Sequence, residues 1–258
     1  MNGKPGAPGR RASCGKPGVC GKIAPSMMCA DFLNLEKDIR TFERLGIEYL
    51  HVDVMDGLFV PNYTLGTDYV RKLKQATNIP IDIHLMVERP EDKLDWFDFG
   101  ENDYVSFHYE AAGHVHRAVQ RIKERGAKAM LALNPATPLG VLEDIVCDLD
   151  GVLIMTVNPG FAGQKLVPQT LDKIRRLRQA RPDIEIEADG NVSFENAVKM
   201  RACGADIFVA GTSSIYAAGT NSIHAVGTNS INAAGTSSVF TTGASLEDNI
   251  AMLRECIR

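Results

Sequence analysis

Two short apolar runs of the chain carry histidine and aspartate at alternate positions. The run YLHVDVM places His51 and Asp53 two residues apart, and the run PIDIHLMV does the same for Asp82 and His84. Because successive side chains of a β-strand point to opposite faces, the members of each pair point to the same side of their strand. A third run, EIEADG, carries Asp189 near its end. Two imidazoles and two carboxylates can therefore converge at one place if the three strands end there.

Imidazole nitrogen and carboxylate oxygen are good ligands for a borderline divalent ion such as Zn²⁺, Mn²⁺, Co²⁺ or Fe²⁺. Judged by spacing alone, these residues could be hydrogen-bonded polar residues of the protein core about as readily as ligands of a metal ion. The number of ionisable groups inside strands favours a metal site, because burying such groups without a role costs free energy. The sequence therefore favours a divalent metal at this convergence.

The elements that must position these groups alternate regularly along the chain. The eight expected strands span residues 22–28, 49–55, 80–87, 104–110, 128–134, 151–157, 185–190 and 206–211. Segments with helical spacing of apolar residues lie between them, and the last helix opens with Ser245 and Asp248 at capping-box spacing. Eight strands alternating with eight helices predict a single-domain α/β (β/α)8 TIM barrel, in which functional side chains lie at the carboxyl ends of the strands.

A doubly wound open sheet shares this alternation of strands and helices. That fold usually shows a glycine fingerprint after its first strand, where this chain reads APSMMCADF. The barrel is therefore favoured over the open sheet.

The composition narrows the class of protein and of partner. The chain has 258 residues, 45% of them hydrophobic and 23% charged, with a net charge of −4, as is ordinary for a soluble globular protein. No run of about 18 apolar residues occurs, so no membrane span is expected. The net charge of −4 suggests neither nucleic acid nor an anionic membrane as partner. The six cysteines form no CxxC pair. This pattern is typical of reduced thiols in a cytoplasmic protein.

The two ends of the barrel region carry unusual segments. Residues 1–21 are rich in Gly and Pro and predict a disordered basic tail, for which a basic interaction arm is the alternative. Residues 210–241 repeat one eight-residue phrase four times: AGTSSIYA, AGTNSIHA, VGTNSINA and AGTSSVFT. A period of eight is too short for a repeat fold, whose units are supersecondary elements. We expect residues 218–241 to be an insertion in the loop after the last strand, at a modest entropic cost.

Three glycine-bearing turns follow the last three expected strands and read PGFAGQ, DGN and GTSS. Small residues let backbone N–H groups approach an anion, and phosphate binding after strands seven and eight is common in this fold. The residues predicted to bind phosphate are Gly163, Gly190, Asn191, Gly211, Thr212 and Ser213. The last repeat copy, Gly235 to Ser238, is the alternative to the first copy.

The segment LHVDVMDGLFVPNYTLG at residues 50–66 resembles the signature of the ribulose-phosphate 3-epimerase family. Six further motifs match in order: APSMMCADF, DIHLMV, FHYE, MTVNPGFAGQ, EADGNV and VAGTSS. The resemblance runs from Lys22 to the last helix and omits only the tail and the repeats. It departs from the family's frequent spellings at PSMMC, DGN and GFAGQ.

The resemblance implies an isomerase that inverts C3 of a ketose phosphate, D-ribulose 5-phosphate to D-xylulose 5-phosphate. The implied ligands of one divalent ion per subunit, most often Zn²⁺, with Fe²⁺, Mn²⁺ or Co²⁺ as alternatives, are His51, Asp53, His84 and Asp189. Asp53 and Asp189 would be the acid/base pair, since inversion through an enediolate needs a carboxylate on each side of the carbon. The implied substrate contacts are Ser26, Met55, His84, Met86, Met155, Gly160, Phe161, Ala162 and Gly163. The family also implies a homo-oligomer, either dimer or hexamer.

Several alternatives remain open from the residues. The spellings PSMMC, LNP and GTSS are closer to the branch acting on D-allulose 6-phosphate, for which the chemistry is the same. A lyase on this fold would carry D-x-K-x-x-D where this chain reads DIHLMV, without lysine. A non-catalytic sugar-phosphate binder would have no need of both Asp53 and Asp189. We also expect His108 and Glu110, which share one face of a strand, to hydrogen-bond behind the site.

Overall fold

The computed structural model describes residues 20–217 and 245–258. The expected tail, apart from Cys20 and Gly21, and the whole expected insertion at 218–241 lie outside the described residues. Within the described ranges, no helix is long and apolar enough to cross a membrane.

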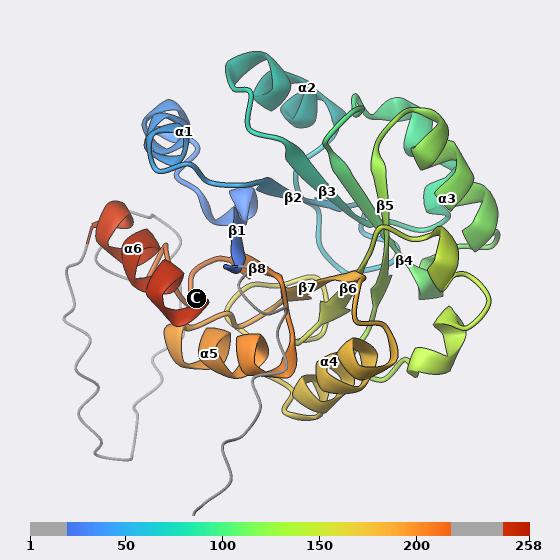
Figure 1. Ribbon diagram of the computed structural model, residues 1–258. Helices are drawn as coiled ribbons and strands as arrows, with labels where there is room; N and C mark the ends of the chain where they lie inside the picture. The colour runs from blue at the N-terminus through green and yellow to red at the C-terminus, as the bar shows by residue number, and fades with distance from the viewer. Residues whose placement is uncertain (1–19, 218–244) are drawn as a thin grey trace, which may run out of the picture.

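Eight parallel strands form a nearly closed barrel with the order β1-β8-β7-β6-β5-β4-β3-β2 (Figure 1). Their bounds are β1 Lys22–Pro25, β2 Leu50–Met55, β3 Ile81–Met86, β4 Tyr104–His108, β5 Lys128–Leu133, β6 Gly151–Met155, β7 Glu185–Asp189 and β8 Ile207–Ala210. The remaining seam, between β1 and β2, carries a single parallel bridge from Ser26 to His51. All eight expected strands are confirmed, and each is shorter than its apolar run. Strand β2 lacks the first residue of its run, and each of the others lacks at least the last residue, where the chain turns into the following loop.

Helices surround the strands on the outside of the barrel (Figure 1). They are α1 Leu35–Arg44, α2 Thr67–Ala76, α3 Val115–Glu124, α4 Gln169–Ala180, α5 Phe194–Cys203 and α6 Leu246–Cys256. The expectation of eight helices is wrong for the described residues. Short 3₁₀ helices follow β3 and β5 instead, beginning at Pro90 after β3 and directly after Pro138 after β5. Proline is compatible with the first turn of an α-helix, and α4 itself begins directly after Pro168, so these prolines mark where the two segments begin and do not explain why they stay short.

Local signals of the sequence account for the ends of several helices. The Ser245 hydroxyl accepts from the backbone N–H of Asp248, whose side chain accepts in return from the backbone of Ser245, so the expected capping box is present. Helix α5 begins after Ser193, whose side chain accepts from the N–H of Asn196, and ends at Gly204 with a φ of 110°. Glycine adopts this left-handed conformation without a steric penalty.

The register of the strands brings the polar residues together. In the β2–β3 ladder His51 lies beside Asp82, Asp53 beside His84 and Met55 beside Met86. A similar pairing places Met155 of β6 beside Asp189 of β7. The barrel interior thus receives two histidine–aspartate pairs from adjacent strands and a further aspartate from β7.

Candidate metal and substrate site

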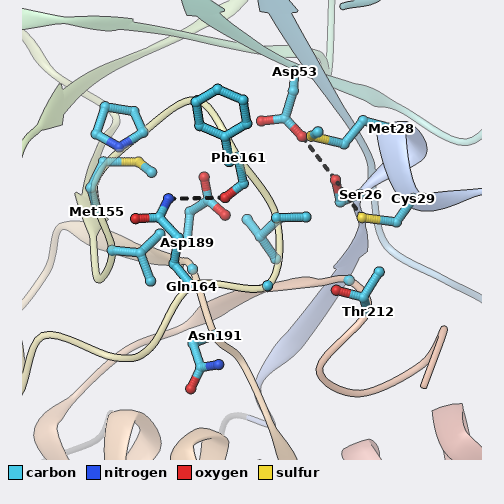
Figure 2. Close-up of a pocket in the computed structure, with 18 of the residues that line it drawn as sticks. Ser26, Met28, Cys29, Asp53, Met155, Phe161, Gln164, Asp189, Asn191 and Thr212 are labelled. Atoms are coloured by element: carbon cyan, nitrogen blue, oxygen red, sulfur yellow. Dashed lines mark hydrogen bonds between the residues drawn. The ribbon is translucent and has the colours of Figure 1, made fainter. Parts of the chain in front are cut away.

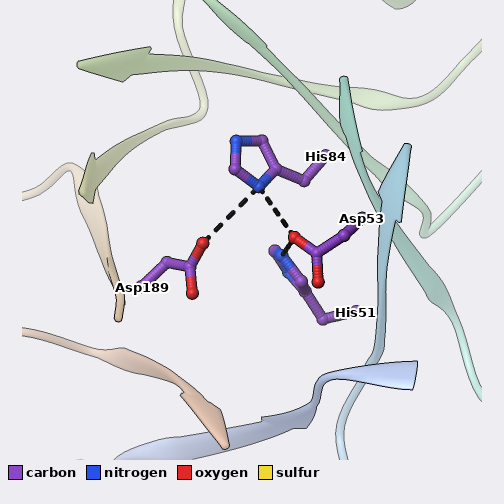
Figure 3. Close-up of side chains that lie close together, drawn as sticks. All are labelled: His51, Asp53, His84 and Asp189. Atoms are coloured by element: carbon purple, nitrogen blue, oxygen red, sulfur yellow. Dashed lines mark hydrogen bonds and ion pairs between the residues drawn. The ribbon is translucent and has the colours of Figure 1, made fainter. Parts of the chain in front are cut away.

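Four side chains from three strands meet inside the mouth of the barrel (Figure 3). Nε2 of His51 lies 3.3 Å from Oδ1 of Asp53, and Nδ1 of His84 lies 3.2 Å from the same oxygen. Oδ2 of Asp189 lies 3.5 Å from Nδ1 of His84. One atom from each of the four residues lies within 4.8 Å of every other. The predicted metal ligands therefore converge as their spacing in the sequence indicates.

The donor set and its dimensions fit a divalent ion. Two imidazole nitrogens and two carboxylate oxygens suit Zn²⁺ and its borderline neighbours. Bonds of about 2.0–2.1 Å in a tetrahedron would separate neighbouring ligand atoms by about 3.3–3.4 Å. The three measured separations, from 3.2 to 3.5 Å, agree with that edge. The site could hold one such ion with little rearrangement.

A second pair of carboxylates lies behind His51. Oδ2 of Asp82 is 2.5 Å from Nδ1 of His51, and Oε1 of Glu187 is 3.2 Å from the same nitrogen. Burial lowers the pKa of His51, but the carboxylates of Asp82 and Asp53 outweigh it and raise the pKa well above its usual value. Burial and the neighbouring Asp82 raise the pKa of Glu187. His51 is thus the buried partner of Glu187 that the sequence alone did not identify.

His84 is held by a different set of groups. Its Nε2 lies 2.9 Å from Nε2 of His108, and Nδ1 of His108 lies 3.3 Å from Oε2 of Glu110. Both histidines are fully buried. His108 and Glu110 therefore occupy the position behind the site that their shared strand face predicts.

The two carboxylates expected to exchange protons differ in environment. Oδ2 of Asp53 accepts a hydrogen bond of 2.8 Å from the hydroxyl of Ser26. Burial alone would raise the pKa of Asp53, but His51 and His84 lower it below its usual value. Burial and the charge of Asp53 raise the pKa of Asp189 to about 6. Two carboxyl groups with separated pKa values on different strands are typical of acid/base sites.

Both carboxylates open onto one cavity (Figure 2). All the expected substrate and phosphate contacts except His84 line it: Ser26, Met55, Met86, Met155, Gly160, Phe161, Ala162, Gly163, Gly190, Asn191, Gly211, Thr212 and Ser213. His84 is fully buried and does not line this cavity. The predicted residues thus form one site in which the histidines lie behind the aspartates.

The walls next to the aspartates are apolar. Met55 and Met86 pack in one buried cluster with Val60, and Phe59 and Met28 lie against that cluster. Met155 is also buried and lines the cavity from β6. Thioether side chains do not titrate, so they surround the carboxylates without offering a competing proton.

The opposite part of the cavity is formed by the turns after β7 and β8. Gly190 has a φ of 116°, and a Cβ at this position would lie 2.5 Å from the side chain of Val157, so no larger residue fits there without movement. Asn191 follows with a φ of 48°. In the view of Figure 2, Asn191 and Thr212 lie at the side of the cavity away from Asp53. A substrate could therefore span from the aspartates to these turns.

Some lining residues were not predicted. Met28, Cys29, Asn158, Gln164 and Val209 also border the cavity. Cys29 lies close to Ser26, with its sulfur 3.9 Å from the hydroxyl oxygen, and burial raises its pKa to about 11. Met28, Cys29 and Gln164 lie within motifs that follow strand ends, and this position in the sequence could have indicated that they border the cavity.

The first repeat copy belongs to this site. Gly211, Thr212 and Ser213 line the cavity, while Ile215 of the same copy is fully buried. The carbonyl of Ile215 accepts a hydrogen bond of 3.1 Å from the side chain of Asn249 in α6. The last copy, at Gly235 to Ser238, lies outside the described residues.

Comparison with solved structures shows the fold. A mutant tryptophan synthase α-subunit from Pyrococcus furiosus matches with a TM-score of 0.57 at 14% identity, over 76% of this chain and 88% of that chain. A thiamine phosphate pyrophosphorylase from the same organism matches with a TM-score of 0.53 at 12% identity, over 92% of this chain and 96% of that chain. At such low identity, these likenesses concern the arrangement of the elements alone.

Comparison with protein sequences identifies the family. Residues 22–216 match the ribulose-phosphate 3 epimerase family. A ribulose-phosphate 3-epimerase of Bacillus subtilis is 44% identical over 197 residues, which cover 74% of this chain and 91% of the relative. The Escherichia coli K12 enzyme of that name is 43% identical over 196 residues, covering 74% of this chain and 87% of the relative. The chain belongs to the ribulose-phosphate 3-epimerase family.

Proposed function

We propose that the chain is a metal-dependent isomerase that interconverts D-ribulose 5-phosphate and D-xylulose 5-phosphate by inverting C3. The observation that carries this proposal is the placement of Asp53 and Asp189. They come from β2 and β7, face one cavity and share one cluster with two buried histidines. Membership of the family and the names of its relatives support the same activity.

In this reaction one carboxylate takes the proton from C3, and the other returns a proton to the opposite face of the same carbon. Asp53 is held for this role, since one of its oxygens faces His51 and His84 while the other accepts from Ser26. Asp189 approaches from β7 across the cavity. Either group can act first, so the same pair serves both directions.

The ion that His51, Asp53, His84 and Asp189 would hold supplies positive charge that stabilises the enediolate formed when C3 loses its proton. Zn²⁺ is our first choice, and Fe²⁺, Mn²⁺ and Co²⁺ suit the same donors. The buried Met55, Met86 and Met155 would limit unwanted protonation of the enediolate by water. The turns that include Gly163, Asn191 and Ser213 would bind the phosphate.

Proton exchange at C3 tests the proposal. The metal-replete protein is incubated in D₂O with D-ribulose 5-phosphate or D-allulose 6-phosphate, and loss of the C3 proton signal is followed by NMR. We expect exchange and epimerisation with the pentulose phosphate, faster than with the hexulose phosphate. The converse preference would favour an allulose 6-phosphate 3-epimerase. Absence of exchange with both sugars would leave only a sugar-phosphate binder.

Replacement of each carboxylate separates catalysis from binding. Asp53→Asn and Asp189→Asn should each lower kcat by at least about a hundredfold, the lower range of what a positioned acid or base contributes. Metal content measured on the same samples shows whether the loss comes from the proton transfer or from the ion. Exposed Asp172 of α4, changed to Asn, is the matched control.

The family also leads us to expect a homo-oligomer. Large apolar side chains are exposed on the loops after β1 and β2, among them Leu33, Leu58 and Tyr63. Light scattering of the purified protein would give the number of subunits.

A further inference from the structure

We propose that His108, Glu110 and Lys173 form a positioning chain that fixes the ring orientation and the tautomer of His84. The inference rests on the proposed metal site, because it concerns how one ligand is presented to the ion. None of the three residues would touch the ion or the substrate. They would act by leaving His84 only one arrangement of hydrogen-bond donor and acceptor.

The first link is the contact between the two histidine rings. Their Nε2 atoms lie 2.9 Å apart, so one nitrogen must carry the proton and the other must accept it. Nδ1 of His84 faces Asp53 and Asp189 and must be free of a proton to bind a metal. The proton of neutral His84 then lies on Nε2, which donates to Nε2 of His108.

The second link follows from the first. Since Nε2 of His108 accepts, the proton of its neutral ring lies on Nδ1, which faces Oε2 of Glu110 at 3.3 Å. The other oxygen of Glu110 accepts from the backbone N–H of Asn134 at 2.9 Å and from the hydroxyl of Thr137. Burial raises the pKa of Glu110, but these bonds outweigh it and bring the pKa to about 2. Glu110 is therefore a charged acceptor held from two sides.

The third link fixes the loop that holds Glu110. Lys173 lies in α4 and is only 4% exposed as a residue, and its ammonium group donates to three carbonyls. These are the carbonyls of Asn134, Pro135 and Thr137, at 2.8, 2.8 and 2.7 Å. An ammonium group has three protons, so this cage satisfies all of them. The loop after β5 is thereby fixed around the Glu110 carboxylate.

His51 offers a comparison within the same site. Its ring is held directly by a carboxylate, since Nδ1 lies 2.5 Å from Asp82. His84 reaches its carboxylate through one additional ring. Both histidines are thus connected to a carboxylate, His51 directly and His84 through His108. The chain behind His84 is the longer one and extends from the centre of the barrel to the outer helix α4.

The test measures metal binding in the absence of substrate. Affinities for Zn²⁺ are obtained by competition with a chromophoric chelator, and the visible absorption of the Co²⁺-substituted protein reports the ligand geometry. Removing a partner of a metal-binding histidine typically weakens binding by about 10- to 100-fold. We expect a loss in this range for His108→Phe, a smaller loss for Glu110→Gln and Lys173→Met, and a shift of the Co²⁺ bands in all three.

Two further variants distinguish positioning from general damage. The amide oxygen of His108→Gln can occupy the place of Nε2 and accept from His84, so this variant should bind Zn²⁺ more tightly than His108→Phe. Ser106→Ala removes a buried hydroxyl from the same strand, where it donates to the carbonyl of Ile83, and should leave the affinity unchanged. Glu110→Gln keeps the test valid if His108→Phe does not fold.

The outcomes separate the chain from the proposed function. If the wild-type protein binds Zn²⁺ and epimerises the sugar, but folded Glu110→Gln and Lys173→Met retain wild-type Zn²⁺ affinity and Co²⁺ spectrum, the positioning chain is refuted and the proposed function stands. If the wild-type protein binds neither Zn²⁺ nor Co²⁺, both the proposed metal site and the positioning chain are refuted.

Discussion

The side-chain amide of Asn191 lies 3.3 Å from the hydroxyl oxygen of Ser213 and joins the turn after β7 to the turn after β8. Nδ2 of Asn196 donates to the amide oxygen of Asn191 at 2.7 Å, which leaves the amide nitrogen to face Ser213. The serine oxygen thus accepts from Asn191, and its own proton can point towards a bound anion. The side chain of Asn191 therefore orders two parts of the predicted phosphate site.

Replacement of Asn191 by glycine should weaken substrate binding while the protein remains folded. Glycine adopts the positive φ of 48° readily, but it cannot hold Ser213. We expect KM for D-ribulose 5-phosphate to rise about fivefold, the effect of one ordinary hydrogen bond, with kcat little changed. Asn191→Ala should be less stable than Asn191→Gly by about 1–2 kcal/mol, because alanine has a Cβ, which is unfavourable at this φ, and lacks the local hydrogen bonds with which asparagine tolerates it. Steady-state kinetics and thermal unfolding measure both effects, and an unchanged KM for Asn191→Gly would contradict the prediction.

Serine substitutions can show which repeat copy binds the phosphate. Ser213 lines the cavity in the first copy, and Ser237 is its equivalent in the last copy. Ser213→Ala should raise KM about tenfold to hundredfold, since hydrogen bonds to charged groups contribute about 1.5–3 kcal/mol. Ser237→Ala should have no effect. The reverse pattern would show that the last copy has replaced the first.

Asp56 should make the stability of the protein dependent on pH in acid. Its carboxylate accepts from the N–H groups of Leu58, Phe59 and Glu88 and from the ammonium group of Lys93 at 2.7 Å. Burial raises the pKa of Asp56, but the bonds from Lys93 and the backbone outweigh it and lower the pKa to about 2.

A depressed carboxyl pKa stabilises the folded state above the pKa of the unfolded chain, about 3.9, and this contribution is lost as the pH falls towards 2. Asp56→Asn should therefore lower the free energy of unfolding at pH 7 and have a much smaller effect at pH 2. Urea titrations at both values test this. An equal difference at the two values would mean that the charge of Asp56 is not involved.

The sequence predicted the strands and the convergence of His51, Asp53, His84 and Asp189 for the same physical reason. Side chains of a barrel strand point alternately into and out of the barrel. His51, Asp53 and His84 are polar residues within apolar runs, and their spacing places them on the inward-facing side of their strands. Consecutive strands of the predicted barrel are neighbours, so the order of the strands follows from their order in the sequence. Once the fold was predicted, no further information was needed to predict that these residues converge.

Contacts between segments far apart in the sequence could not be predicted in this way. Glu187 and His51 lie 3.2 Å apart because β7 and β2 face each other inside the barrel, and no local pattern encodes that pairing. Lys173 lies in an amphipathic helix, where lysine usually faces water, yet its ammonium group is enclosed by carbonyls of another loop. The segments after β3 and β5 were expected to be α-helical from the rhythm of the fold, but they form short 3₁₀ helices, and no local signal in the sequence accounts for this.

Deletion of residues 218–241 should leave catalysis largely intact. The first copy already provides Gly211, Thr212 and Ser213 to the cavity, and its Ile215 is fixed to α6 by Asn249. The deletion removes three complete copies and keeps residues 242–244 as the link to the cap of α6. Because loop-closure entropy changes slowly with length, a shorter link should raise stability slightly or leave it unchanged.

We expect kcat/KM of this deletion variant to remain within about threefold of the full chain, less than the roughly fivefold that loss of one ordinary hydrogen bond would cause. A scrambled segment of the same 24 residues is the control that separates length from sequence. If the deletion reduces kcat/KM a hundredfold and the scrambled chain behaves likewise, the additional copies contribute groups to the site. A loss in the deletion alone would instead mean that the three-residue link is too short for α6 to reach the position where Asn249 holds Ile215.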